Sequence, residues 1–375
     1  MPLSRLSRSI DLPLYSKLSQ VILGLIGFFY IIYIGRDVLT PVVFSLVFAI
    51  LLNPAINFLC GRGLNRPLAI LIVLAVSFLA VLGLLYFIGI QLSMFADTFP
   101  QFKKNFESMF NDILNWVSRT FNVARPQIDQ WVNNVKKDSM GNGTAVIGQT
   151  LGSITGVLAM LFLMPVYMFT ILFYKPLLLQ FVASLFDKRQ HTVVAEVLQE
   201  TKVLIQSYLA GLLIEMVIVA VMNAGGLLII GVKYAILLGI LGALLNLIPY
   251  IGGIIAIALP VIIALATGNP NQVIWVVALY LFNQFIDNNI VVPRIVASKV
   301  KINAFISILV VFIGGALWGI SGMFLSIPIT AIAKVIFDRI DGLQPFGLLL
   351  GDNQPDLGKQ IFRFKKPARK KEDNA

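Results

Sequence analysis

Residues 244–253 read LLNLIPYIGG and interrupt a segment that is otherwise apolar from Ala235 to Thr267. A segment of that length could cross a bilayer, for which about 20 apolar residues suffice. Proline removes a backbone hydrogen bond and glycine loosens the chain, so the cluster predicts a break in a helix. The solvent around the chain decides whether this break is a plain helix end or a turn with a function.

The composition indicates that the solvent is lipid. Of 375 residues, 58% are hydrophobic and only 13% are charged, which is too few charges for the surface of a water-soluble chain of this size. The basic start precedes an apolar run without a convincing cleavage site, which predicts a retained span rather than a signal peptide. With one cysteine, Cys60, and one histidine, His191, neither an internal disulfide nor a cysteine- or histidine-rich metal site is expected. We therefore expect a polytopic membrane protein without metal or cofactor.

Apolar runs divide the chain into about eight spans of an all-α transmembrane bundle. The first five predicted spans are residues 18–34, 38–52, 67–91, 151–174 and 209–230. In the first amphipathic region, Phe99, Phe102 and Phe106 recur at three- and four-residue steps, which is typical of one helix face. The predicted divisions are a cytoplasmic N-terminus (1–17), N-terminal transmembrane helices (18–93), an external amphipathic helical region (94–150), a transmembrane helix (151–174), a cytoplasmic amphipathic helical region (175–208), a transport core with broken helices (209–342) and a basic cytoplasmic tail (343–375).

Basic residues in short loops predict the orientation, because they resist translocation. Arg5 and Lys17 place the N-terminus inside, and Arg62 with Arg66 places the loop after the second span inside. Counting crossings from there, the segment 235–267 must begin and end on the outer side. That leaves two short spans or, as the favoured interpretation, a re-entrant hairpin with LIPYIGG at its tip. Such a tip must face protein or a water-filled cavity, which makes it a candidate site.

Charged side chains within apolar spans are costly and usually functional. Glu215 lies in the fifth predicted span, and Asp287 lies in NQFIDNNIVVPRI. Gln284, Asp287 and Asn288 are three or four residues apart and share a helix face. This pattern predicts a polar lining for solute or ion; the alternative is a span end in inner water, anchored by Arg294. The candidate pathway residues are Asn246, Pro249, Tyr250, Gly252, Gly253, Asn283, Gln284, Asp287, Asn288, Pro293 and Glu215.

A second broken pattern, GGALWGISGMFLSIPITAI, covers residues 314–332. It predicts two final spans, 305–320 and 322–337, joined at Ser321. Two apolar segments interrupted by glycine and proline are a pointer to the substrate site of a transporter. Close helix packing through small residues is the competing interpretation. The candidate hinge or packing residues are Gly314, Gly315, Gly319, Gly322 and Pro328.

Neither an enzyme nor a nucleic-acid-binding protein is expected. Residues 319–322 spell GISG, which in rhomboid-type proteases carries a serine nucleophile, but that serine needs a base and His191 lies far earlier. Phosphate-binding loops of the Walker type are absent from the sequence. The net charge of +11 is concentrated in inner loops and the tail, where topology and anionic lipid headgroups account for it.

Several blocks of sequence resemble the autoinducer-2 exporter family of bacterial membrane transporters. They are TPVVFSLVFAILLNPAINFL (40–59), GALLNLIPYIGGIIAIALPVIIAL (242–265) and the block from DNNIVVPRI to SIPITAI (287–332), with the long loop after the third span and the basic tail. The resemblance covers nearly the whole chain. It implies a multi-pass protein of the bacterial inner (plasma) membrane that moves small solutes without ATP. The basic residues of both ends predict that both termini are cytoplasmic. The family is also similar to pentameric elevator-type carriers, which implies a homo-oligomer.

Members of that family are described as exporters of the autoinducer-2 quorum-sensing signal, and others as sodium/proton antiporters. We therefore expect a secondary transporter or exporter of small solutes, with sodium(lithium)/proton antiport as the alternative and a non-transport scaffold or regulator as the alternative of another class. The expected partners are a small polar solute or a monovalent cation, and the lipid bilayer. Antiport would need Asp287 and Glu215, whereas export of a signal would use Asn246, Tyr250, Asn283 and Asn288 to bind hydroxyls.

Overall fold

The computed structural model describes residues 13–121, 124–127, 129–130, 162–248, 252–266, 270–296 and 301–352. These residues form helices, and the only β-type pairing among them is an isolated bridge between Ile302 and Gly351. The expected all-α class is therefore confirmed. The helices are α1 (Leu14–Ile34), α2 (Arg36–Gly61), α3 (Arg66–Phe121), a helix over Phe162–Phe173, α6 (Lys175–Ser184), η1 (Lys188–Gln190), α7 (His191–Ile230), α8 (Ala235–Asn246), α9 (Gly252–Ala266), α10 (Pro270–Ile286), η2 (Asp287–Val296), α11 (Ala304–Arg339) and α12 (Gln344–Leu350).

The lengths of these helices fit a multi-pass membrane protein, since about 20 helical residues cover the 30 Å of a bilayer core. Four described helices could each cross the membrane singly, and Phe162–Phe173 with α6, which meet at 64°, make a fifth crossing if they form one broken span. The predicted count of about eight spans is not confirmed, and the first part of the predicted fourth span lies outside the described residues. The helices long and apolar enough to cross singly are Arg36–Gly61, Arg66–Asp97, Lys188–Ile230 and Ala304–Arg339.

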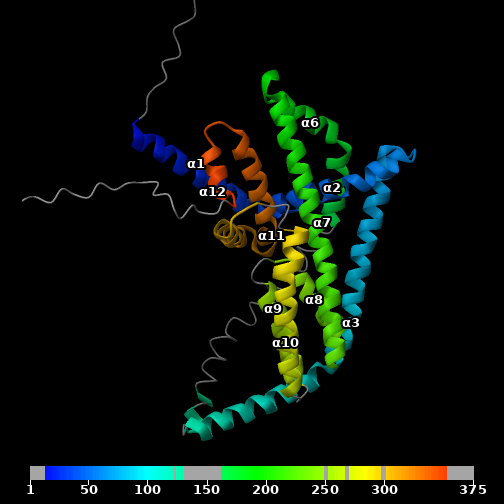
Figure 1. Cartoon of the computed structure of the whole chain (residues 1–375), viewed down its shortest axis with the longest axis vertical. Coiled ribbons are helices and arrows are strands. Elements are labelled where there is room, and N and C mark those ends of the chain that lie inside the picture. Colours follow the sequence, from blue (N-terminus) through cyan, green and yellow to red (C-terminus); the bar gives the residue numbers. More distant parts are fainter. Residues whose placement is uncertain are drawn as a thin grey trace, which may run out of the picture.

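Two helices run through boundaries that the sequence suggested between domains. α3 continues from the third predicted span into the predicted external region, and its last part lies across the lower ends of α7 and α10 in Figure 1. α7 likewise joins the predicted inner amphipathic region, 175–208, to the fifth predicted span. The changes in polarity near residues 94 and 209 thus occur along continuous helices.

The segment interrupted by LIPYIGG forms a hairpin of two short helices. α8 has 12 residues and α9 has 15, so both fall short of the length of about 20 residues that a full crossing needs. The helices run antiparallel: Gly252 approaches the backbone of Leu245 too closely for a Cβ, and Gly242 lies opposite Ala256 further along. The chain therefore turns back as the charge pattern predicted, although residues 249–251 at the tip lie outside the described residues.

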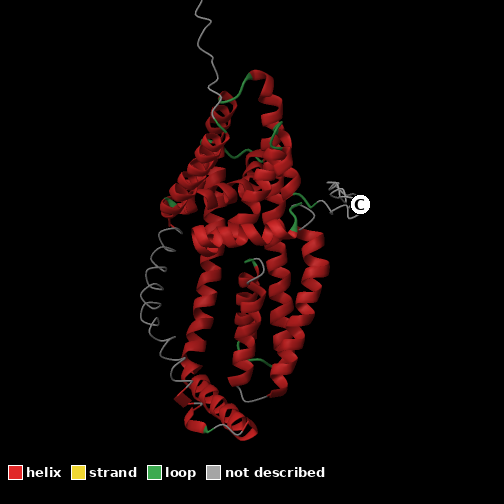
Figure 2. Ribbon diagram, turned by 90° about the vertical axis from the view of Figure 1, so that its left-hand side faces the viewer, coloured by secondary structure: helices red, strands yellow, loops and turns green. Residues whose placement is uncertain are grey.

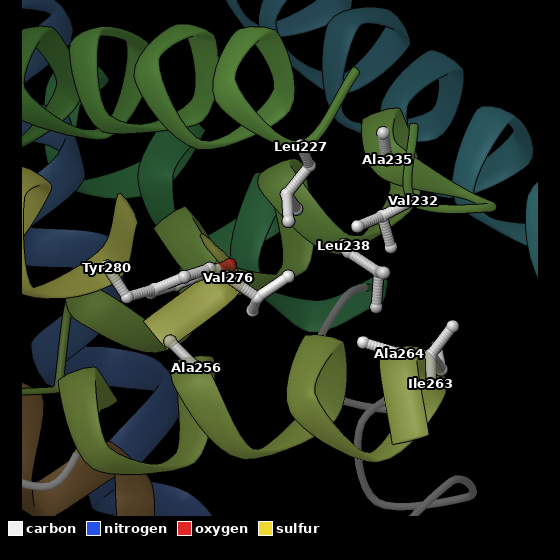
Figure 3. Packing of buried hydrophobic residues seen from close by; sticks show 9 residues of the cluster. All are labelled: Leu227, Val232, Ala235, Leu238, Ala256, Ile263, Ala264, Val276 and Tyr280. Atoms are coloured by element: carbon white, nitrogen blue, oxygen red, sulfur yellow. The ribbon is translucent and has the colours of Figure 1, made fainter. Parts of the chain in front are cut away.

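Apolar side chains hold this hairpin against α7 and α10. Figure 3 shows their packing, with α8 and α9 side by side and Tyr280 reaching in from α10. In lipid such packing is driven by close van der Waals contact, because the lipid chains are as apolar as the side chains. The cluster consists of Leu227, Val232, Ala235, Leu238, Ala256, Ile263, Ala264, Val276 and Tyr280.

α11 is a second hairpin. Its helical geometry breaks at Trp318 and at Gly319, which has φ 60° and ψ −140°, a conformation that glycine adopts without strain. The arms 304–317 and 320–339 fold back so that Gly314 meets the backbone of Gly322. The predicted pair of final helices is thus present, but the chain turns at residues 318–319 and not at Ser321. The Trp318 indole donates to the Ile32 carbonyl at 3.0 Å and ties this turn to α1.

α2 links the remaining helices. It crosses α7 in Figure 1 and packs on α7 and α11 through a cluster that includes Val47, Leu209 and Leu325. A further cluster joins α2 to α3 through Ile56 and Ile70. Figure 2 shows the result as helices standing side by side in the lower part of the view, with crossing helices above them. The α8–α9 hairpin lies among the upright helices, in contact with α3, α7 and α10.

We expect Gly314→Val to disrupt the α11 hairpin. A Cβ at Gly314 would collide with the carbonyl of Gly322. Overpacking of this kind costs about 1–3 kcal/mol, so the thermal unfolding temperature of the detergent-solubilised protein should fall. Gly83→Val is the matched control, because no described atom lies within 4 Å of a Cβ at that position of α3. Equal unfolding temperatures for the two variants would contradict the close contact.

Candidate functional site

The polar segment after α10 starts where the α-helix changes into a π-helix, η2. Pro293 lies inside η2 and has no backbone N–H, so a regular α-helical ladder cannot pass through it. The side chain of Asn289 donates to the Phe285 carbonyl at 2.8 Å and satisfies one acceptor at the junction. π-Helical turns occur often at functional sites, and here the turn begins at Asp287.

Two carboxylates from distant parts of the sequence meet at this junction. Glu215 of α7 is 6% exposed and Asp287 is 4% exposed. Asn246, the last residue of α8, donates from its Nδ2 atom to Glu215 Oε1 at 3.3 Å and to Asp287 Oδ2 at 3.0 Å. The other oxygen of Asp287, Oδ1, is buried and has no hydrogen-bond partner in the part of the chain that the structure describes. One amide group therefore connects α7, α8 and η2, and leaves one carboxylate oxygen free to bind something else.

A cavity of about 840 Å³ lies beside this cluster. That volume is in the range of pockets that hold small molecules. Its wall combines polar groups with apolar side chains from α7 to α11. The polar lining residues are Tyr208, Glu215, Asn246, Tyr280, Gln284, Asp287, Asn288 and Ser307, and the apolar ones include Leu212, Ile254, Ile257, Val292 and Ile327.

A smaller hollow of about 20 Å³ adjoins the same cluster, enough for a single water molecule or ion. Asn283 Nδ2 donates to Asn223 Oδ1 at 2.9 Å within its wall, and the buried Tyr280 hydroxyl has no hydrogen-bond partner among the residues described. Gly253 lines it too, and a Cβ there would lie 2.8 Å from Gln284 Oε1. The glycine thus allows the amide oxygen of Gln284 to approach the start of α9.

The structure brings most of the predicted pathway residues together, but not all of them. Gly252 closes the α8–α9 turn, as described above. Pro293 is exposed on η2 and lines neither cavity, while Pro249 and Tyr250 lie outside the described residues. The residues that line the large cavity, the small hollow or both are Glu215, Asn246, Gly253, Asn283, Gln284, Asp287 and Asn288.

The predicted hinge or packing residues all lie in α11, away from the carboxylates. Gly315 faces Met323 across the hairpin, and Gly319 occupies the turn. Pro328 is fully buried in the second arm, next to Ile327, which borders the large cavity. α11 therefore forms part of the cavity wall, although none of its glycines is among the lining residues.

Four polar lining residues were missed by the sequence prediction: Tyr208, Asn223, Tyr280 and Ser307. Tyr280 lies three residues before Asn283 and seven before Asp287, so helical spacing would have placed it on the same face. Asn223 is a polar residue in an apolar run, eight residues after Glu215, and that signal was available too. Tyr208 and Ser307 carried no comparable signal, because each lies at the start of an apolar helix segment.

The chemistry of the cluster favours a bound proton or cation. Two carboxylates buried beside one amide are costly unless a positive charge neutralises one of them. The unpartnered Asp287 oxygen and the oxygen of Gln284 are both acceptors on the wall of the small hollow. The amides and hydroxyls around the large cavity can bind the hydroxyl groups of a solute.

Comparison with known proteins gives consistent matches. The model of the AI-2E family transporter matches residues 22–342. In Escherichia coli (strain K12), the protein named "Putative transport protein YhhT" is 25% identical over 339 residues, which are 90% of this chain and 94% of that protein. "AI-2 transport protein TqsA" of the same strain is 25% identical over 338 residues, covering 88% and 94%. "Putative permease PerM" is 28% identical over 321 residues, covering 83% and 90%.

We expect Asn246→Leu to lower the unfolding temperature of the detergent-solubilised protein, because two buried carboxylates lose their shared donor. A hydrogen bond to a charged group contributes about 1.5–3 kcal/mol. The loss should shrink when Glu215→Gln and Asp287→Asn are already present, which a double-mutant cycle measures. Asn289→Leu is the control, since within the described residues that side chain bonds to a backbone carbonyl and to no carboxylate. Strictly additive effects would show that Asn246 does not couple to the carboxylates.

Proposed function

We propose that this chain, which belongs to the AI-2E transporter family, is a secondary carrier whose small polar solute binds between α7, α8, α9 and α10. The match of the family model to residues 22–342 confirms the resemblance that the sequence suggested. The similar proteins support membrane transport as the class of activity. One observation carries the proposal: the Asn246 amide bridges two buried carboxylates at the wall of a cavity of about 840 Å³. A scaffold has no need of such a buried polar cavity.

The solute that we propose is the autoinducer-2 signal, moved outward. A similar protein is named for AI-2 transport, and a furanone-type molecule with hydroxyl groups suits the cavity wall. Asn246, Gln284 and Asn288 offer amide donors and acceptors, and the carboxylates accept bonds from hydroxyls. Apolar side chains such as Ile254 and Ile257 would cover the ring.

The two hairpins are the proposed moving parts. Broken helices that line a cavity are typical of secondary transporters, in which one bundle moves against another around a fixed site. α8–α9 supplies Asn246 and Gly253 to the cavity, and α11 supplies Ile327. We place the protein in the bacterial inner membrane with both termini cytoplasmic, as a homo-oligomer, in line with the charge pattern and the family resemblance.

Sodium(lithium)/proton antiport is the second candidate, and the small hollow favours it. Its volume of about 20 Å³ suits one dehydrated monovalent ion better than an organic solute. Oxygen ligands suit such a hard cation, and the hollow offers the free oxygen of Asp287 with the amide oxygen of Gln284. A proton on the same carboxylate would exclude the cation, which is the competition that an antiporter needs.

We expect Asn246→Ala and Gln284→Ala each to slow AI-2 release from cells by about five- to tenfold, because a lost hydrogen bond to the solute costs roughly 1–1.5 kcal/mol. Gln199→Ala is the matched control, since Gln199 lines a separate cavity between α7 and α11. The measurement is extracellular AI-2 over time at equal protein abundance. Comparison of all exported metabolites with and without the protein identifies another solute if AI-2 release does not change, and unaltered flux of that solute in both variants would contradict the proposed site.

Antiport has its own assay in vesicles with an inward-acidic pH gradient and a pH-sensitive dye. Addition of sodium or lithium should collapse the gradient with the wild-type protein and leave it intact with Asp287→Asn, because the amide cannot exchange a proton for a cation. Asp338→Asn is the control, since Asp338 pairs with Lys334 near the surface. A wild-type protein that shows no response to either cation would reject the antiport candidate.

A further inference from the structure

Three basic residues gather where α2, α3, α6 and α7 meet, and none of them lines the carboxylate cavity. Arg66 is the first residue of α3, Lys175 is the first residue of α6, and Lys202 lies in α7. Arg66 and Lys202 both lie within electrostatic range of Lys175. Within the described part of the chain, none of the three forms an ion pair with a carboxylate. The cluster therefore holds positive charge that no described carboxylate of the chain neutralises.

Hydrogen-bond donors in this cluster also lack acceptors. The ammonium group of Lys175 donates to Asn53 Oδ1 at 3.2 Å, and Arg66 Nη2 donates to the Leu172 carbonyl at 3.4 Å. The Nδ2 atom of Asn53 and the Nε atom of Arg66 are buried and have no hydrogen-bond partner among the described residues. Asn53 itself is only 4% exposed. An unsatisfied buried donor costs about 1–3 kcal/mol, so the cluster favours a ligand that supplies acceptor oxygens.

Lys202 lies near a contact between α7 and α2. Gln206, one turn further along α7, donates to the Ile50 carbonyl of α2 at 2.7 Å. This bond holds α7 on α2 near Asn53, which lies about one turn after Ile50, and Lys202 lies within electrostatic range of the Lys175 ammonium group that donates to Asn53. Four different helical segments thus contribute to one cluster of donors.

We propose that Asn53, Arg66, Lys175 and Lys202 bind the phosphate group of an anionic phospholipid. Phosphate is the anion that suits a guanidinium fork combined with ammonium groups and amide N–H donors. Lipid is the source to which the surroundings point. Large apolar side chains beside the cluster are exposed, as expected for contact with acyl chains: Phe58, Leu68, Leu71, Phe173 and Leu177.

The predicted orientation agrees with this ligand. Arg62, Arg66 and Lys175 lie in segments that the charge rule places on the inner side, where anionic lipids are enriched. A phosphate at this point would join the start of α3 to the 64° bend between Phe162–Phe173 and α6. It would therefore brace the static helices around α2, in a place that neither the solute nor the coupling ion reaches.

The test uses the full-length protein in neutral detergent, titrated with phosphatidylglycerol or phosphatidylcholine while the unfolding temperature is recorded. Phosphatidylglycerol should raise the unfolding temperature of the wild type, and phosphatidylcholine should not. Arg66→Gln and Lys175→Gln should each weaken the apparent affinity for phosphatidylglycerol about fivefold per charge removed. Arg62→Gln is the matched control, because Arg62 belongs to the same loop but stacks on Phe58, with its guanidinium 4.2 Å from the ring centre.

Asn53→Asp gives a second measurement that does not depend on removing a charge. Its carboxylate would take the place of the lipid phosphate, so the variant should be more stable than the wild type without lipid and should lose its response to phosphatidylglycerol. An undiminished response in Asn53→Asp, or in the double variant Arg66→Gln, Lys175→Gln, would overturn the proposal. Equal stabilisation by inorganic phosphate would overturn the lipid as the source. Transport activity is not a readout, so failure of the proposed carrier function leaves these outcomes unaffected.

Discussion

The amide of Asn246 is the point on which the arrangement around the cavity depends. It donates to Glu215 and to Asp287, which belong to helices far apart in the sequence. For both bonds to form, α8 must end beside the middle of α7 and the α10–η2 junction. The hairpin of α8 and α9 meets that requirement, because it enters among the longer helices and turns back. Buried charge thus determines where the hairpin ends, and lipid permits that turn only inside protein.

Glycines make this meeting of polar groups possible. Gly239 of α8 lies directly against the backbone of Ala224 in α7, and Gly253 of α9 leaves room for the Gln284 side chain. Small residues let helices approach closely enough for interhelical hydrogen bonds. In α11 the same residue type has another role, because Gly314 and Gly322 contact each other and close a turn. The two broken segments look alike in sequence, yet one presents polar groups to a cavity and the other packs on itself.

Local features of this fold could be predicted from the sequence, whereas contacts between distant segments could not. Charge parity predicted the return of the α8–α9 segment, and five polar residues among seven marked the region of Asp287. No spacing rule relates Glu215 to Asp287, so their shared donor appears only in three dimensions. The turn of α11 was predicted at Ser321 but occurs at Trp318 and Gly319, because the positive φ that closes it falls on the glycine. The sequence also did not predict that α3 and α7 continue beyond their apolar stretches. A change from apolar to polar residues indicates that the surroundings of a helix change, but it does not show that the helix ends there.

The distribution of charge constrains what the cavity can carry. The chain has a net charge of +11, yet its large cavity contains two carboxylates and no basic residue among the described lining. The positive charges around Arg66, which no described carboxylate pairs with, lie instead beside exposed apolar side chains. An anionic solute in the cavity would meet buried negative charge without a counter-ion, at a cost that hydrogen bonds do not offset. The proposed pathway therefore suits neutral or cationic solutes, whereas a negatively charged group such as a lipid phosphate suits the basic cluster around Arg66.

A neutral solute and a proton can occupy the proposed site together, because protonation of one carboxylate adds a hydrogen-bond donor without adding charge to the solute. A cation and a proton instead compete for the same carboxylate oxygens. Protonation of Glu215 or Asp287 would therefore be compatible with solute binding in an exporter but would oppose cation binding in an antiporter.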